Sequence, residues 1–199
     1  MGINAQDVKT LRDKTGAGFM ECKRALEDAS GDMDKAVLLL RERGLSKAQK
    51  KRGRTAGEAV IESYVHADGK IGVLVEVACE TDFVARNAVF RQLCKELCLQ
   101  VAAMKPLAVS REKLPGGVIE SEKRIYAQQS EGKPAHVVEK IVAGKLEKFF
   151  ADACLLDQPY IRDEKKTIRQ LIDETIGRLG ENVEVQRFVR LEAGEGLEQ

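Results

Sequence analysis

The sequence lacks tryptophan, has only two histidines in 199 residues, and carries almost no net charge. The 33 basic and 32 acidic residues nearly cancel, so no overall field would draw the chain onto nucleic acid or an anionic membrane. Hydrophobic residues make up 43% and charged residues 33%, which excludes general disorder and is typical of short helices with solvated outer faces. This length predicts one or two compact units with a real core.

Long apolar runs are also missing. No segment approaches the roughly 20 apolar residues that a membrane span needs. The first residues contain neither a basic stretch nor an apolar run typical of a secretory signal. We therefore expect a cytoplasmic protein with no membrane partner.

The five cysteines are an odd number and contain no Cys-x-x-Cys pair. Each lies in an apolar pattern, which predicts buried, reduced thiols. Cys94 and Cys98 are spaced to share one helical face as two metal ligands, but no third ligand lies nearby in the sequence. We expect neither a metal site nor a cofactor.

Motifs for nucleotide binding and covalent catalysis are absent as well. The sequence contains no G-x-x-x-x-G-K-[ST] phosphate loop, no G-x-G-x-x-G, no G-x-S-x-G and no H-E-x-x-H. Neither His66 nor His136 has a catalytic companion at a recognised spacing. The residues favour a binding protein with no catalytic residues, not an enzyme.

Cap and stop residues divide residues 1–45 into three short helices. Asn4 and Asp32 are typical N-caps, whereas Gly16 and Gly44 are typical stops. Three helices this short enclose only a small core, and few apolar side chains are enough to fill it. Apolar residues near Phe19 are therefore expected to remain available for a partner.

Residues 46–56 are basic and almost devoid of apolar side chains. This pattern predicts a solvated linker or a polar extension of the preceding helix. Contact with RNA is the alternative, but the segment has no interleaved aromatic residues for base stacking. We expect no direct nucleic-acid binding.

Residues 57–193 predict an α+β core. Alternating apolar residues on both sides of the turn at Asp68 and Gly69 indicate a β-hairpin. A similar alternation from Val183 to Leu191 predicts a third strand, completing a small three-stranded antiparallel sheet packed by helices. Residues 105–135 carry the least information, and residues 194–199 are expected to form a flexible tail.

The junction between the hairpin and the next helix, residues 81–86, is held by regular structure at both ends. Such a junction presents side chains in a fixed geometry, and Asp82 and Phe83 occupy it. Asn87 is a typical N-cap for the helix that follows. Two roles remain open for Phe83: periodicity favours burial beneath the hairpin, and exposure toward a partner is the alternative.

Several motifs together resemble the elongation factor Ts family over nearly the whole chain. They are Leu11-Arg12-Asp13-Lys14-Thr15-Gly16-Ala17-Gly18, Cys22-Lys23-Arg24-Ala25-Leu26, Thr81-Asp82-Phe83-Val84-Ala85-Arg86-Asn87, Asp157-Gln158-Pro159-Tyr160 and Arg187-Phe188. One departure is Phe19, where the family commonly has methionine; both side chains are large and apolar.

The resemblance implies a guanine-nucleotide exchange factor whose partner is elongation factor Tu, in its GDP-bound and nucleotide-free states. It also implies an N-terminal three-helix domain resembling ubiquitin-associated (UBA-like) domains. By the family's action, the Asp-Phe pair enters beside the nucleotide site, disturbs the magnesium-holding region and releases GDP, and GTP then displaces the factor. The residues implied in partner binding are Thr81, Asp82, Phe83, Val84, Arg86 and Asn87, with a weaker contribution from Leu11, Phe19 and Met20. On this basis Phe83 is expected to be exposed.

The length resembles the short form of the family, which has one core subdomain. In that form two copies supply what one long chain contains, which implies a homodimer and a two-plus-two complex with elongation factor Tu. Two other interpretations remain. One is an adaptor that binds ubiquitin-like or nascent polypeptides through its three helices; the other is an RNA-binding accessory protein that uses the basic segment.

Overall fold

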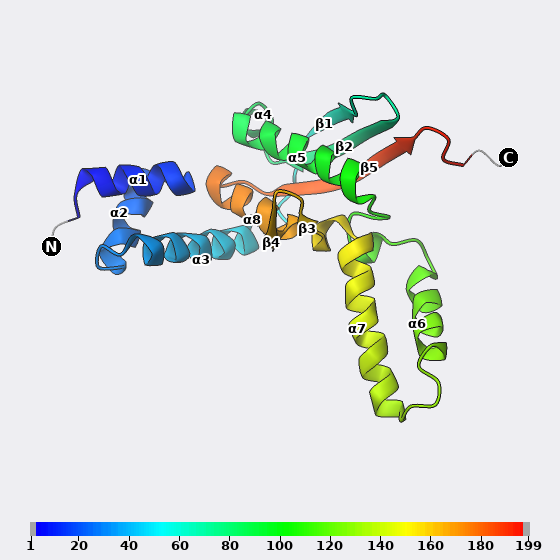
Figure 1. The fold of residues 1–199 in the computed structure, drawn as a ribbon. Helices are drawn as coiled ribbons and strands as arrows, with labels where there is room; N and C mark the ends of the chain where they lie inside the picture. Colours follow the sequence, from blue (N-terminus) through cyan, green and yellow to red (C-terminus); the bar gives the residue numbers. More distant parts are fainter. Residues whose placement is uncertain (1–2, 197–199) are drawn as a thin grey trace. The chain divides into compact units, whose positions relative to one another are not determined.

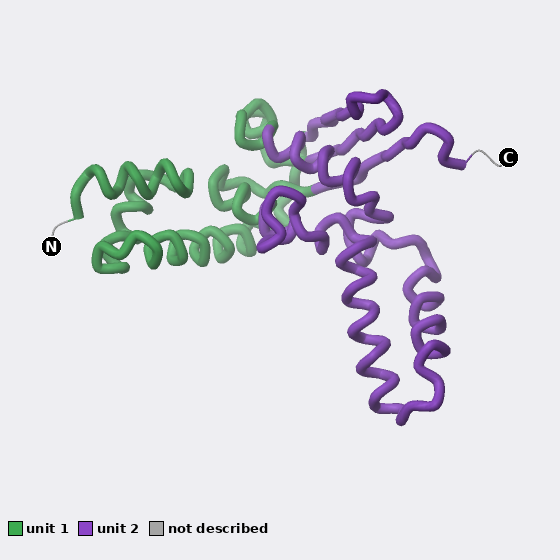
Figure 2. Tube along the Cα trace, in the orientation of Figure 1, with its two compact units in different colours: residues 1–58, 78–91, 172–184 green, residues 59–77, 92–171, 185–199 purple. Residues whose placement is uncertain are grey.

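The computed structural model describes residues 3–196 and shows an α+β protein (Figure 1). These residues form two compact units (Figure 2). Unit 1 comprises the residues up to Glu58, Ala78–Arg91 and Ile172–Glu184, and unit 2 comprises Ala59–Val77, Gln92–Leu171 and the residues from Val185 on. These units differ from the domains expected from the sequence. The boundaries of those domains stay a prediction.

Unit 1 begins with the three expected helices, α1 (Ala5–Thr15), α2 (Phe19–Asp28) and α3 (Met33–Lys51). The side chain of Asn4 caps α1 by accepting a hydrogen bond from the Asp7 amide at 2.7 Å, and the carboxylate of Asp32 caps α3 in the same way. A single small core joins the helices, and its buried members are Val8, Leu11, Cys22, Ala25, Leu26, Ala29, Ala36 and Leu40. Likeness to UBA domains stays a prediction.

The expected end of the third helix at Gly44 is wrong, because α3 continues to Lys51. Helix α8 (Ile168–Leu179) crosses α3 here so closely that a Cβ atom on Gly177 would lie 3.1 Å from the Cα atom of Gly44. Close approach of the two backbones therefore accounts for the glycine at position 177. A Cβ atom on Gly44 itself would meet nothing within 4 Å.

The basic segment is therefore the last part of α3 and the residues just after it, and much of its charge is paired within unit 1. Arg52 donates two hydrogen bonds of 2.6 Å to the buried carboxylate of Asp173, and Lys47 pairs with Glu21. Arg54 lies 3.7 Å from Glu80. These pairs reduce the free positive charge on which the RNA interpretation depends.

The expected three-stranded antiparallel sheet is confirmed, with the order β1 (Glu58–Val65), β2 (Ile71–Cys79), β5 (Val183–Glu192). The β1–β2 turn is at Asp68 and Gly69, where Gly69 adopts a φ of +70°. On one face Val73 and Val75 are buried, and helix α5 (Ala88–Met104) supplies buried apolar residues such as Leu97 and Val101. On the opposite face, Ile61, Leu74 and Val189 are exposed.

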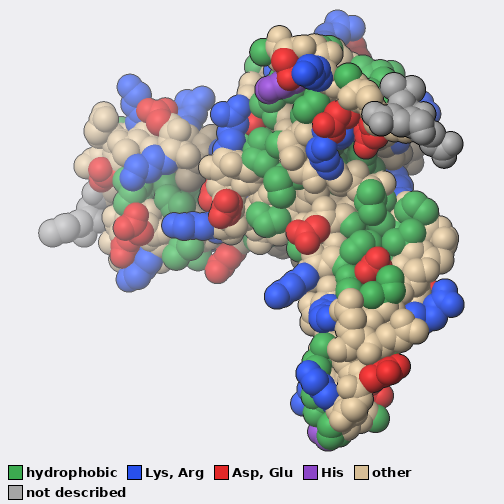
Figure 3. Space-filling view, turned by 45° about the vertical axis from the view of Figure 1, so that its right-hand side comes forward, with side chains coloured by type: hydrophobic (Ala, Val, Ile, Leu, Met, Phe, Trp, Pro, Cys, Tyr) green, Lys and Arg blue, Asp and Glu red, His purple; other side chains and the backbone are tan. Residues whose placement is uncertain are grey.

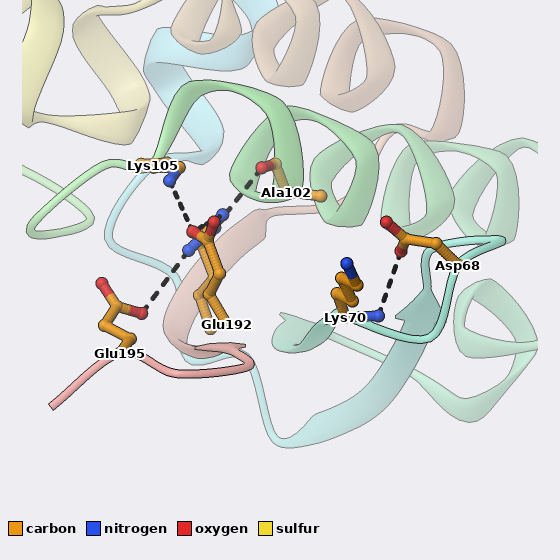
Figure 4. A network of polar contacts seen from close by, with 7 residues as sticks. Asp68, Lys70, Ala102, Lys105, Glu192 and Glu195 are labelled. Atoms are coloured by element: carbon orange, nitrogen blue, oxygen red, sulfur yellow. Dashed lines mark hydrogen bonds and ion pairs between the residues drawn. The ribbon is translucent and has the colours of Figure 1, made fainter. Parts of the chain in front are cut away.

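Polar contacts hold β5 to α5 within unit 2 (Figure 4). The guanidinium of Arg190 donates to the backbone carbonyl of Ala102 at 3.3 Å and to the carboxylate of Glu192 at 2.8 Å. Lys105, just beyond the end of α5, donates to the same carboxylate at 2.5 Å. The strand is thereby fixed against the C-terminal end of the helix.

Residues 105–135, the least informative part of the sequence, contribute to a helical hairpin in unit 2. Helices α6 (Val118–Gln128) and α7 (Ala135–Ala153) run side by side (Figure 1). The 3₁₀ turns η1 (Arg111–Lys113) and η2 (Leu155–Asp157) flank them, and Arg111 links the two regions by hydrogen bonds to Glu147 and Asp157. Hydrophobic side chains gather on the hairpin's upper part (Figure 3).

A second, two-stranded sheet was not expected from the sequence. It pairs β3 (Pro159–Tyr160) with β4 (Asp163–Thr167). The strands are too short and too charged for an alternating pattern to reveal them. A buried carboxylate holds them instead, because Glu96 on α5 accepts hydrogen bonds from Tyr160 at 2.9 Å and Arg162 at 2.7 Å.

Replacing Glu96 with glutamine is expected to lower the free energy of unfolding by about 1 to 3 kcal/mol at neutral pH. Burial opposes ionisation of this group, but the donors Arg162, Tyr160 and Gln92 together lower its pKa from the usual 4.5. A carboxylate whose pKa is lowered by folding stabilises the protein above its unfolded pKa, and this contribution is lost as the pH falls below 4.5. Urea unfolding at neutral and acidic pH should therefore show the gap between native and variant narrowing in acid; an equal gap at both values would contradict this.

None of the helices within residues 3–196 is long and apolar enough to span a membrane.

Candidate functional site

The junction at residues 81–86 forms a single helical turn, α4 (Asp82–Ala85). Thr81 is its N-cap, with the hydroxyl oxygen accepting a hydrogen bond from the Val84 amide at 3.4 Å. Val84 and Ala85 are buried and anchor the turn. The side chain of Phe83 points away from this anchor and is 82% exposed.

Exposure of Phe83 confirms the expectation drawn from the family resemblance. The expectation of burial from strand periodicity was wrong because the residue belongs to a helical turn, not to the strand. In a turn of about 3.6 residues, adjacent positions face different directions, so burying Val84 and Ala85 leaves Phe83 outside. An exposed phenylalanine on a rigid turn is suited to binding a partner.

A carboxylate distant in the sequence holds the turn in place. Glu181 follows α8 and accepts two hydrogen bonds from Thr81, one from the backbone amide at 3.1 Å and one from the hydroxyl at 2.8 Å. Because the hydroxyl gives its proton to Glu181, its lone pairs remain free for the Val84 amide. One side chain thus supports the cap of α4, although 100 residues separate it from Thr81.

The segments on either side are also joined. Asn182 donates its backbone amide to the carboxylate of Glu80 at 2.6 Å and its side-chain amide to the carbonyl of Arg54 at 2.9 Å. Glu80, Glu181 and Asn182 were not singled out in the sequence. They carry no local motif, and only the folded chain brings residues 80–81 beside residues 181–182.

The outer face of the turn carries opposite charges. Arg86 lies 3.2 Å from the carboxylate of Asp82, and both side chains remain substantially exposed. The next residue, Asn87, accepts a hydrogen bond from the Val89 amide at 2.8 Å, which confirms it as a cap of α5. Asp82 and Arg86 are therefore free to exchange their mutual contact for contacts with a partner.

Cys79 lies beneath the turn, with its thiol 3.3 Å from the carbonyl oxygen of Thr81. Burial raises the pKa of this thiol, and the nearby Glu181 carboxylate raises it further. A buried thiol with a raised pKa is a poor nucleophile. All five cysteines are buried and form no disulfide, as expected, and burial raises the pKa of Cys98 to about 12.

The expected N-terminal contact residues divide into two kinds. Phe19 and Met20 begin α2 and are 48% and 56% exposed. Leu11 is wholly buried in the core of the three helices and offers no surface to a partner. Leu11 is a packing residue, so of these three residues only Phe19 and Met20 offer a surface to a partner.

Within residues 3–196, no three His, Cys, Asp or Glu side chains are grouped so as to hold a metal ion. Cys94 and Cys98 are both buried in α5.

The site at residues 81–87 combines an exposed apolar side chain, flanking charges and a rigid base. The class that the fold and site define is an α+β protein in which a fixed turn presents a phenylalanine, an arrangement suited to binding a protein partner.

Comparison with known sequences identifies the family. The profile of the family described as "Elongation factor TS" matches residues 44–195. The chain is 54% identical over 198 residues to elongation factor Ts of Thermoanaerobacter sp. (strain X514), covering 98% of this chain and 97% of the relative. It is 56% identical over 197 residues to elongation factor Ts of Coprothermobacter proteolyticus, covering 98% and 100%.

The chain belongs to the elongation factor Ts family. This family acts in translation elongation, and its role is nucleotide exchange on elongation factor Tu. The relatives compared are of nearly the same length as this chain.

Proposed function

We propose that the chain binds elongation factor Tu carrying GDP and opens its nucleotide site with the turn at Thr81–Asn87. Phe83 enters beside the nucleotide, and Asp82 and Arg86 contact the region that holds magnesium and phosphate. GDP then leaves, and arriving GTP displaces the chain. The observation that carries this proposal is the exposure of Phe83 on a turn whose base is buried and hydrogen-bonded.

Exchange of this kind requires no covalent step. The chain needs only to bind the nucleotide-free partner more tightly than the GDP-bound partner, because each ligand then weakens the binding of the other by the same factor. A thousandfold faster release corresponds to about 4 kcal/mol of such preference. Burial of one phenylalanine contributes roughly 1.5 to 3 kcal/mol, so Phe83 alone is not sufficient.

Phe19 and Met20 are the proposed additional contacts. They follow the Gly16 turn, where a Cβ atom would lie 3.2 Å from the guanidinium of Arg178 in the last turn of α8. Three residues later in the chain, Glu181 holds Thr81. Residues 178–181, at the end of α8 and just beyond it, therefore lie close to the turn before Phe19 and to the turn that carries Phe83, which supports action of both on one partner.

We further propose a homodimer formed through the exposed face of the three-stranded sheet, giving a two-plus-two complex with elongation factor Tu. Apolar side chains from all three strands lie on this face: Ile61 and Val65 on β1, Leu74 on β2, and Val189 and Leu191 on β5. The ion pair of Arg187 and Glu76 lies beside them. A second copy would cover this apolar face.

The proposed setting is the cytoplasm, where translation elongation takes place. The adaptor interpretation gives no reason for a turn that is held rigidly and carries an exposed phenylalanine. The RNA interpretation is weakened because several basic side chains of its segment are paired with carboxylates. Neither is supported by the structure as well as nucleotide exchange.

Stopped-flow release of a fluorescent GDP analogue from bacterial elongation factor Tu tests the proposal. Native chain at saturating concentration should speed release by about a thousandfold relative to buffer, corresponding to the preference of about 4 kcal/mol given above. Release at the spontaneous rate in micromolar chain would overturn the exchange function.

A further inference from the structure

Glu181 is not part of the exposed face of the turn, but it holds the turn from the side. It lies beyond the end of α8, where Gly180 adopts a φ of +74°, and it accepts both donors of Thr81. The next residue in the chain, Asn182, is also fixed, because its backbone amide donates a hydrogen bond to the carboxylate of Glu80. The carboxylate thus rests on a braced segment and reaches toward the turn.

The turn α4 has little means of holding its own geometry. A helix of four residues is far below the length at which helical hydrogen bonds sustain themselves. Its stability and direction therefore come from the buried Val84 and Ala85 and from the cap at Thr81. Of these, only the cap depends on a polar partner elsewhere in unit 1.

A carboxylate satisfies Thr81 in a way that other side chains cannot. Two acceptor oxygens are needed, since the amide and the hydroxyl of Thr81 both donate. Glutamine has one acceptor oxygen, and its amide group would face a donor. Loss of the carboxylate would free the hydroxyl to rotate and would weaken its hydrogen bond to the Val84 amide.

We propose that Glu181 is a positioning residue that fixes the direction of Phe83 by clamping Thr81. It touches neither nucleotide nor partner and acts only through the turn. This inference rests on the proposed function, since it states how one side chain is kept ready for exchange. Misplacement of a contact group by about 1 Å can lower a rate by up to about a hundredfold.

The test compares Glu181→Ala and Glu181→Gln with the native chain by the maximal rate of GDP release from elongation factor Tu at saturating chain. Both variants should reduce this rate by about tenfold, within the range that a hydrogen bond to a charged group supports. Glu184→Ala is the matched control, because this exposed glutamate lies three residues away in the same unit. It should stay within about twofold of native.

A second readout separates positioning from general stability. In a Phe83→Ala background, Glu181→Ala should lower the rate by much less than tenfold, because the phenylalanine is absent and only the contacts of Asp82 and Arg86 can still be displaced. Thr81→Ser, which keeps the hydroxyl, should preserve exchange, whereas Thr81→Val should lose about tenfold. Amide hydrogen exchange at Val84 should accelerate in Glu181→Ala while the helices α1 to α3 stay protected.

Two failures are distinguishable. If the native chain does not speed release, the proposed function is overturned and this inference with it. If the native chain speeds release but Glu181→Ala matches it, or the tenfold loss persists in the Phe83→Ala background, only the positioning role is overturned.

Discussion

Phe83→Ala is expected to slow GDP release from elongation factor Tu by about tenfold to a hundredfold relative to the native chain. The side chain is 82% exposed, so its removal leaves no cavity in the free protein. Its loss should instead remove roughly 1.5 to 3 kcal/mol of burial against the partner, and about 1.4 kcal/mol corresponds to a factor of ten. The maximal release rate at saturating chain measures this directly.

A matched control separates this effect from loss of surface hydrophobicity in general. Leu107 is also a large exposed side chain, and it lies outside the turn, the N-terminal helices and the exposed sheet face. Leu107→Ala should release GDP at the native rate. Equal rates for native and Phe83→Ala chains would keep the exchange function and discard the entry of Phe83.

Leu74→Asp is expected to convert the proposed dimer to a monomer. Leu74 lies on the central strand of the sheet and is 49% exposed on the apolar face proposed to pair with a second copy. An aspartate at the centre of that interface would bury two unpaired carboxylates, at a cost of several kcal/mol. The dissociation constant should therefore rise by at least about a hundredfold.

Light scattering coupled to gel filtration measures this change. The native chain should elute with twice the 22.0 kDa chain mass and Leu74→Asp with the mass of one chain. Leu107→Asp places the same charge on an exposed leucine elsewhere and should remain dimeric. Circular dichroism checks that Leu74→Asp stays folded, and a native chain of single mass would contradict the dimer.

Local patterns were sufficient to predict most of the fold. The caps at Asn4, Asp32 and Asn87 were read from single residue types, and each makes its expected hydrogen bond. The β-hairpin followed from alternation around Asp68 and Gly69, and the third strand from alternation after Val183. These features depend on interactions between residues close in sequence, which a pattern can represent.

Features that depend on distant contacts were not predictable in this way. Gly44 resembled a helix stop, yet α3 continues to Lys51, and the tight requirement for glycine lies at Gly177 in α8, which packs against Gly44. The β3–β4 sheet has no alternating pattern and depends on Glu96 in another helix. The clamp of Thr81 by Glu181 joins residues separated by 100 positions.

The candidate site shows the same division. Thr81–Asn87 was found from a resemblance, because a short motif is conspicuous in a sequence. Leu11 belongs to another matching motif, but its side chain is wholly buried. A motif therefore indicates which segment matters without distinguishing side chains that contact a partner from those that hold the fold.

The most direct test of nucleotide exchange by differential binding is the equilibrium affinity of elongation factor Tu for GDP, measured with and without saturating native chain. Differential binding predicts that the chain weakens GDP binding by about a thousandfold, and that GDP weakens binding of the chain by the same factor. A GDP affinity unchanged by the chain would rule out exchange by differential binding, because a protein with no preference between the two states cannot shift the partner toward release.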